Sequence, residues 1–239
     1  MKAGTPFSRA LWAAVIFLSL IGCAVVIRRI VILWPVIAHG YHAPVISSNP
    51  RLAQPGATDD LFARYLYLTL IHILPGLLFM ILGPLHFNAA IRARYLRWHR
   101  WSGRVFLICP GIIGISALVM SLWMPAIGGV NQAAATTLFG CFFLFALGKA
   151  FWHVRRREIA LHREWMIRGF ATGLAVAAIR PIIGFFFATS SLTGLTPREF
   201  FGTAFWIGFV VSLMVAETWI HITAPARYGM ATSTHGVEH

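Results

Sequence analysis

Charged residues are scarce in this chain of 239 residues, and acidic residues are the scarcest of them. Asp and Glu together number 7, and all charged residues make up 11% of the chain, against about a quarter in a soluble domain. Hydrophobic residues make up 58%, and the mean hydropathy is +0.74. The shortage of charge therefore excludes a soluble globular domain and indicates a membrane protein.

The chain also lacks the motifs of several enzyme classes. The three cysteines lie inside apolar runs, which implies no disulfide framework. CxxC, HExxH, phosphate-loop and nucleophile-elbow motifs do not occur, so hydrolase and nucleotide-dependent activities have no support. The net charge of +13 comes from short Arg clusters between apolar runs, a pattern typical of loops at an anionic membrane surface rather than of nucleic-acid binding.

Long apolar segments recur along the chain. At 1.5 Å per residue, six of them are long enough to cross about 30 Å of hydrocarbon. They cover residues 10–27, 63–87, 105–124, 133–152, 169–189 and 200–221. We therefore predict an all-α protein, a single transmembrane domain over 1–239 that forms a six-helix bundle. Spans two to five would form an up-and-down four-helix core.

The distribution of Lys and Arg predicts the orientation. With the N-terminus inside, thirteen of these residues lie in the cytoplasmic regions and five in the outer ones, which predicts a bacterial inner-membrane protein with both termini in the cytoplasm. Arg28 and Arg29 would then face outward, and residues 30–42 would lie along the outer surface. Leu20 to Cys23 resemble a lipobox, but the apolar run continues beyond Cys23, so we expect an uncleaved anchor.

One charged and aromatic phrase occurs twice, as LRWHRWSGRVF at 96–106 and as ALHREWMIRGF at 160–170. Both copies fall at the cytoplasmic start of a span, where Trp side chains anchor in the headgroup layer and arginines reach phosphates. That interpretation leaves His99 and His162 unexplained. On diagonal spans of the core, the two would face each other and could ligate a haem b iron, with Arg104 and Arg168 near the propionates.

The second span carries two further histidines on one face. His72 and His86 are 14 residues apart, which is about 21 Å along a helix, and Gly76, Phe79 and Gly83 lie between them on that face. Small residues there would let a flat macrocycle or another helix approach closely. His72 would be about 16 Å deep if this span began near residue 61.

Two more charged groups fall inside spans. Arg180, in span five, is at a depth close to that of His72, which predicts either a polar His72–Arg180 site or a contact from Arg180 to a propionate. Glu217 in span six is the one acidic residue inside a span. Its expected partners are His162, Arg163 and Arg168, with charge compensation or a proton relay as its role.

The ordered phrases IHILPGLLFMILGPLHF, LRWHRWSGRVF and ALHREWMIRGFATGLAVAAIRP resemble the bacterial predicted membrane proteins grouped as domain of unknown function 2306. The resemblance covers residues 61–185 and implies a multi-pass membrane protein. It puts His72, His99, His162, Arg168 and Arg180 on motif positions. The chain departs from the family pattern at His86, where Gln is expected. His99 and His162 are therefore the better ligand pair.

Three functions remain open from the sequence. The first is electron transfer through haem b with a quinone or a redox partner protein, by analogy with transmembrane di-haem cytochromes. The second is a non-redox protein, either a small transporter or a membrane-embedded partner of another protein, whose His and Arg residues make polar interhelical contacts. The third is an intramembrane enzyme acting on lipid, for which no nucleophile–base pair is visible.

Overall fold

The computed structural model describes residues 6–40 and 57–223, and all regular structure in these ranges is helical. In chain order the helices are α1 (Pro6–His39), α2 (Ala57–Arg64), α3 (Leu66–Phe87), α4 (Ala89–Arg94), α5 (Leu96–Trp123), α6 (Gly129–Arg155), α7 (Ile159–Thr193) and α8 (Pro197–Thr223). Within the described ranges, six of them, α1, α3 and α5–α8, are long and apolar enough to cross a membrane. The prediction of an all-α protein with six spans is confirmed.

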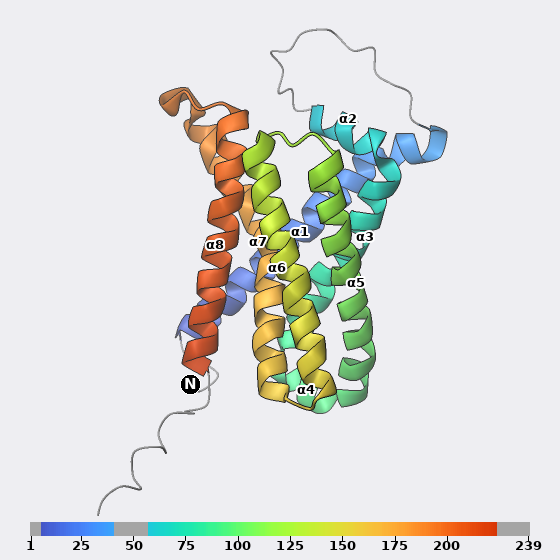
Figure 1. Ribbon diagram of the computed structural model, residues 1–239, viewed down its shortest axis with the longest axis vertical. Coiled ribbons are helices and arrows are strands. Elements are labelled where there is room, and N and C mark those ends of the chain that lie inside the picture. The colour runs from blue at the N-terminus through green and yellow to red at the C-terminus, as the bar shows by residue number, and fades with distance from the viewer. Residues whose placement is uncertain (1–5, 41–56, 224–239) are drawn as a thin grey trace, which may run out of the picture.

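The four central helices form the up-and-down arrangement expected of spans two to five (Figure 1). Each packs against the next along the chain, α3 against α5, α5 against α6 and α6 against α7. Helix α8 packs on α6 and α7, and α1 packs on α3 and α7. Large apolar side chains point outward, with Phe17, Val31 and Leu122 exposed by 60, 65 and 70%. Such a surface contacts the lipid bilayer.

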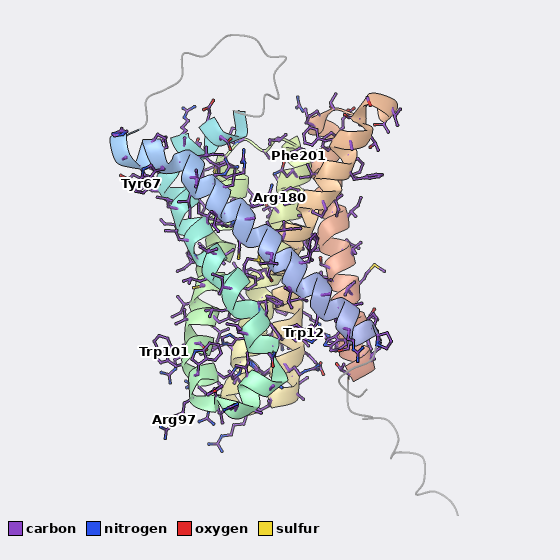
Figure 2. The ribbon with its side chains drawn as sticks, turned by 180° about the vertical axis from the view of Figure 1, so that it is seen from behind. Trp12, Tyr67, Arg97, Trp101, Arg180 and Phe201 are labelled. Carbon is purple, nitrogen blue, oxygen red and sulfur yellow. The ribbon has the colours of Figure 1, made fainter. Side chains whose placement is uncertain are left out.

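Helix α1 differs from the prediction. The apolar segment was expected to end near residue 27 and to be followed by a surface segment, but the helix continues unbroken to His39. Arg28 and Arg29 mark the predicted end of the span. Both pair with Asp59 of α2, which lies far along the chain. Helix α1 therefore runs as one long tilted helix across the face of the bundle shown in Figure 2.

The second span begins later than expected. Helix α2 ends at Arg64, and Tyr65, with φ −105° and ψ 44°, interrupts the helix before α3 begins at Leu66. His72 therefore lies six residues, about 9 Å, from the start of its helix rather than 16 Å.

Aromatic rings and glycines close the core between α3 and α7. A Cβ atom added at Gly83 of α3 would lie 2.1 Å from the Phe170 ring of α7. Reciprocally, a Cβ atom at Gly173 of α7 would lie 2.6 Å from the Phe79 ring of α3. Each helix thus inserts one phenylalanine over a glycine of the other, and the Phe79 and Phe170 ring centroids are 5.4 Å apart. The same contacts fix the register of two antiparallel helices.

Candidate functional site

Four histidines gather at the end of the core where α4 lies. Helices α3, α5, α6 and α7 each contribute one of them, in that order His86, His99, His153 and His162. The ring centroids of His86 and His99 are 5.1 Å apart. His99 also lies within electrostatic reach of His162, as His162 does of His153. The structure therefore brings the predicted pair His99 and His162 to one end of the bundle, in a histidine cluster with two further members.

Hydrogen bonds orient two members of this cluster in the same way. The Nδ1 atom of His162 lies 2.9 Å from the carbonyl oxygen of Ala150, and Nδ1 of His153 lies 2.5 Å from a carboxylate oxygen of Glu158. Because carbonyl and carboxylate oxygens accept, each Nδ1 carries the proton and donates it. In the neutral ring Nε2 then holds a lone pair, which is the usual arrangement of a metal-ligating histidine.

His86 has both ring nitrogens occupied. Its Nδ1 donates to the carbonyl oxygen of Leu82 at 3.1 Å, and Nε2 lies 3.3 Å from Oγ of Ser102. The ring also stacks on Phe106, with centroids 4.8 Å apart, and is 7% exposed. These contacts describe a packed side chain in which both ring nitrogens have a polar atom at hydrogen-bond distance, although the Ser102 hydroxyl also lies 2.7 Å from the carbonyl oxygen of Trp98. A ligand role for His86 would require the hydrogen bond to Ser102 to break.

His99 is the exception in the cluster. Its Nδ1 atom is buried and has no hydrogen-bond partner among the described residues. A buried polar atom without a partner costs about 1–3 kcal/mol, so most such atoms in folded proteins are satisfied by protein, water or a ligand. Among the described residues at this end of the bundle, His99 is thus the side chain with a buried polar atom that lacks a hydrogen-bond partner.

The face of α3 between His72 and His86 is filled by protein at Phe79 and Gly83, whereas a Cβ atom added at Gly76 would meet no atom within 4 Å. Phe170 occupies the space beside Gly83, while Phe79 packs against the rings of Phe106 and Phe143. The small residues of this face were expected to let either a flat macrocycle or another helix approach closely. At Gly83 the structure shows the approach of another helix, α7. Among the described residues no group of three or more His, Cys, Asp or Glu side chains is arranged to hold a metal ion.

The arginines near the cluster differ in their partners. Arg168 makes a bidentate ion pair with Glu217, with N–O distances of 2.6 and 2.9 Å, and its guanidinium lies 4.8 Å from the centre of the Trp165 ring. The expected partner of Glu217 is thereby found, and Arg168 is already neutralised. Arg104 is exposed and makes no ion pair within the described part of the chain.

The two copies of the repeated phrase also differ in their tryptophans. Trp101 is 67% exposed, as an interfacial anchor would be. Trp165 instead packs edge-on against Phe145 of α6 and joins the core. The repetition in the sequence is therefore explained only in part by equivalent positions at the starts of two helices. The other feature that the two copies share is a histidine that points inward.

A second polar site lies in the opposite half of the core. The Nδ1 atom of His72 on α3 is 2.9 Å from Oγ of Ser116 on α5. Arg180 on α7 is exposed and makes no hydrogen bond or ion pair with any described residue, and the charge that acts on it is that of Arg29. The partner of His72 in the described residues is therefore Ser116, and the predicted contact between His72 and Arg180 is not seen. Figure 2 shows Arg180 beside α1, in the half of the bundle away from α4.

The serines were not expected, although the sequence holds a signal for them. Ser102 and Ser116 of α5 are 14 residues apart, the same separation as His72 and His86 of α3. Because the two helices are antiparallel, each serine meets one histidine, at 3.3 and 2.9 Å. Matching spacings of polar residues on neighbouring spans would have predicted this pairing.

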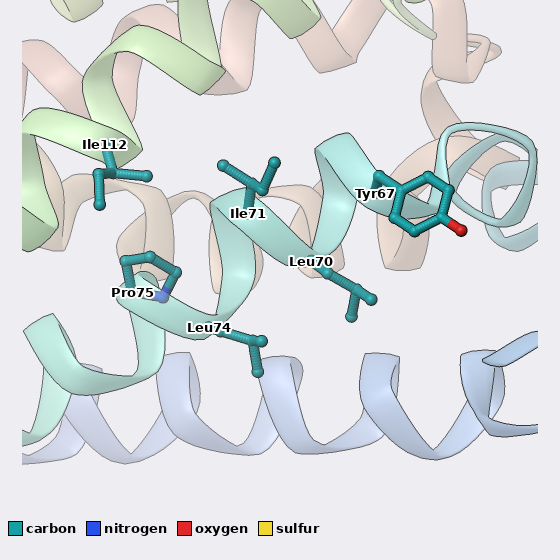
Figure 3. A pocket seen from close by; sticks show the side chains of 6 residues that line it. All are labelled: Tyr67, Leu70, Ile71, Leu74, Pro75 and Ile112. Atoms are coloured by element: carbon teal, nitrogen blue, oxygen red, sulfur yellow. The ribbon is translucent and has the colours of Figure 1, made fainter.

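The apolar hollow on the outside of α3 does not belong to either site. Its volume is about 340 Å³, and its lining consists of Tyr67, Leu70, Ile71, Leu74, Pro75 and Ile112 (Figure 3). These residues lie on the side of α3 that faces away from α7, so the hollow is part of the lipid-facing surface.

The chain belongs to the family described as predicted membrane protein (DUF2306), whose model matches residues 69–220. The match confirms the resemblance and extends it past residue 185 through most of α8, so that Glu217 lies within the family region. No curated protein and no solved structure matches the chain.

Proposed function

We propose that this membrane protein holds a haem b at the histidine cluster, with His99 and His162 as the axial ligands, and serves as an electron-transfer subunit. The observation that carries the proposal is the buried Nδ1 atom of His99, which has no partner among the described residues. An iron ligand, or a rotation of the ring that accompanies ligation, would give this imidazole the interaction that it lacks.

The second ligand is supported by its orientation. The Nδ1 proton of His162 is held by the carbonyl oxygen of Ala150, so Nε2 is the nitrogen left for iron. Such a bond fixes the tautomer and the ring plane of a ligating histidine. His99 and His162 come from α5 and α7, which are diagonal in the core, as a bis-histidine site between helices requires.

The cationic side chains near the cluster fit the propionates of a haem. Arg104 on α5 is exposed and unpaired within the described residues, and Arg92 and Arg163 lie within electrostatic reach of each other at this end. Haem, when bound, supplies one-electron redox chemistry, and the protein supplies the ligands, the charge and the exclusion of water. A quinone in the bilayer or a partner protein would be the electron donor.

The orientation of the chain is part of the same proposal. The Arg-rich segments 92–104 and 155–168 lie at one end of the bundle in Figure 1, together with the start of α1 and the end of α8. Retention of Lys and Arg in the cytoplasm then puts the histidine cluster on the cytoplasmic side of a bacterial inner membrane, with both termini inside.

A non-redox function is the second candidate, and one observation favours it. Arg168 and Glu217 neutralise each other between α7 and α8, and Arg163 donates to Oγ1 of Thr223 at 2.9 Å. Polar contacts of this kind join helices in membrane proteins that have no cofactor. Under this interpretation the histidines are interhelical contacts of a small transporter or of a membrane-embedded partner of another protein.

The test is haem content in matched variants. His99→Ala and His162→Ala are expected to abolish bound haem, measured per mole of purified protein, while the chain still inserts in the membrane. The control is His221→Ala, because His221 is exposed on α8 and lies outside the cluster. If either cluster variant keeps the haem content of the control, the ligand assignment is wrong.

A further inference from the structure

We propose that the lipid-facing side of α6, near the C-terminal end of the helix, binds one phospholipid that carries a net negative charge. Lys149 and Arg156 contact its phosphate, and an acyl chain lies in a hollow over Gly148. This site is on the outside of the bundle, separate from the histidine cluster, and does not depend on a haem being bound there.

A hollow of about 490 Å³ opens on this side of α6, and its lining consists of Phe145, Gly148, Lys149 and Trp152. Steps of three and four residues along a helix keep these side chains on one face. The side chains of Phe145 and Trp152 are 55 and 53% exposed, and a Cβ atom added at Gly148 would meet no atom within 4 Å. The hollow is therefore an apolar surface open to the acyl chains of the bilayer, with one cation in its lining.

Two cations bracket Trp152 along α6, Lys149 one turn before it and Arg156 one turn after it. The guanidinium carbon of Arg156 lies 4.2 Å from the centre of the Trp152 ring. The ammonium of Lys149 lies 5.8 Å from the centre of the Trp165 ring on α7. Lys149 is six residues before the end of α6, and Trp165 is six residues after the start of α7. This contact therefore keeps the ammonium about 9 Å from the helix ends, whereas a lysine that only snorkels would extend toward water.

Neither of these two cations is neutralised by protein. The described residues include three carboxylates at this end of the bundle, and each of them is paired with another side chain. Glu158 pairs with His153, whereas Glu164 and Glu217 both pair with Arg168. The two cations on α6 make no ion pair within the described part of the chain, so an anion from the bilayer would supply the missing charge.

The order of apolar and charged groups along α6 matches that of one phospholipid. The open space over Gly148 and beside Phe145 comes first, toward the centre of the bilayer, and Arg156 follows at the headgroup end. A phosphate between Lys149 and Arg156 would leave its acyl chain free to run down the hollow. The same two cations would repel the amine of a zwitterionic headgroup, which favours a lipid with net negative charge. A free phosphate has no apolar part to fill the hollow.

Native mass spectrometry of the full chain in detergent tests the proposal by counting bound lipids during a titration. Phosphatidylglycerol is the probe, and phosphatidylcholine with the same acyl chains is the comparison, because the two phosphodiesters differ in net charge. We expect one phosphatidylglycerol to bind at least about tenfold more tightly than phosphatidylcholine. Equal affinities for the two lipids would overturn the proposal.

Charge variants separate this site from the general basicity of this end of the bundle. Lys149→Gln is expected to weaken the binding of phosphatidylglycerol by about tenfold, because a charge-assisted hydrogen bond is lost, and Lys149→Arg should retain most of the affinity. Arg156→Gln should have a smaller effect, since Arg156 is exposed. The matched control is Arg97→Gln, because Arg97 is exposed at the same end on α5 and has no ion pair within the described residues (Figure 2). An equal loss of affinity in Arg97→Gln and Lys149→Gln would refute the site.

A second pair of variants tests the hollow. Gly148→Leu would fill the space meant for the acyl chain and should weaken the binding of phosphatidylglycerol by about tenfold. The control is Gly184→Leu on α7, where the glycine is also exposed and an added Cβ would also meet no atom within 4 Å. Thermal unfolding without added lipid shows which variants are folded, and Arg156→Gln carries the charge comparison if Lys149→Gln is not. Equal affinities of the two leucine variants would contradict the proposal.

Discussion

Gly83→Ala tests the packing that sets the register of α3 and α7. The new methyl group would lie 2.1 Å from Cε2 of Phe170, whereas carbon atoms pack at about 3.5–4.0 Å. The ring cannot simply move aside, because it contacts Phe79 and Phe87 with centroid distances of 5.4 and 4.9 Å. Overpacking of this kind costs about 1–3 kcal/mol, so we expect the free energy of unfolding to fall by that amount.

A matched glycine and a double mutant make the test specific. Gly76 is on the same helix with no atom within 4 Å of an added Cβ, so Gly76→Ala should be neutral or stabilising by up to about 1 kcal/mol. Phe170→Ala alone should cost about 3–5 kcal/mol. In that background the clash is gone, and Gly83→Ala should no longer destabilise. Denaturant titration in detergent micelles, followed by tryptophan fluorescence, measures all four. The reasoning is refuted if Gly83→Ala behaves as Gly76→Ala does, or if its cost persists without the Phe170 ring.

Three further predictions follow from other parts of the fold. Glu217→Ala should lower the free energy of unfolding by about 1–3 kcal/mol in the same titration, because it leaves Arg168 without its bidentate partner. Asp60→Ala, at an exposed position of α2 without a hydrogen bond or ion pair among the described residues, should cost under about 1 kcal/mol, and equal costs would contradict the assignment. Gly194 ends α7 with a left-handed backbone at φ 69°, so Gly194→Ala should destabilise the protein by about 1 kcal/mol. Arg157 also has a left-handed backbone, at φ 61°, so Arg157→Gly should stabilise it by a similar amount, and the opposite signs would refute the backbone argument. In intact cells an impermeant thiol reagent should label Ser191→Cys but not Arg97→Cys, since both side chains are exposed at opposite ends of the bundle, and the reverse pattern would invert the topology.

The spans of this fold could be predicted from the sequence, whereas the burial of single side chains could not. Hydropathy alone was enough for the six spans, because each is a continuous apolar run. The predicted end of α1 was wrong because the partner of Arg28 and Arg29 is Asp59, which is 31 and 30 residues further along the chain. Ser102 looks accessible in an Arg-rich stretch, yet it is 3% exposed and bonded to Trp98.

The sequence predicted the positions of the candidate site residues but not the directions of their side chains. The positions of His99 and His162 followed from the repeated phrase and from the order of the spans, so the sequence was sufficient to bring them to one end. The hydrogen bond of His162 to Ala150 and the unpartnered Nδ1 of His99 depend on side-chain directions that no spacing contains. The Gly83–Phe170 contact could not be predicted without knowing the register of two helices that are distant in the chain. Because of this contact, the part of the α3 face around Gly83 that was expected to accept a macrocycle packs against another helix.

The most direct test of the proposed function is the optical spectrum of the unaltered chain, purified from cells supplied with a haem precursor. Ligation by His99 and His162 predicts a low-spin haem b, with sharp α and β bands in the dithionite-reduced minus oxidised difference spectrum. A folded, monodisperse protein with a featureless difference spectrum would contradict the haem proposal and favour the non-redox function.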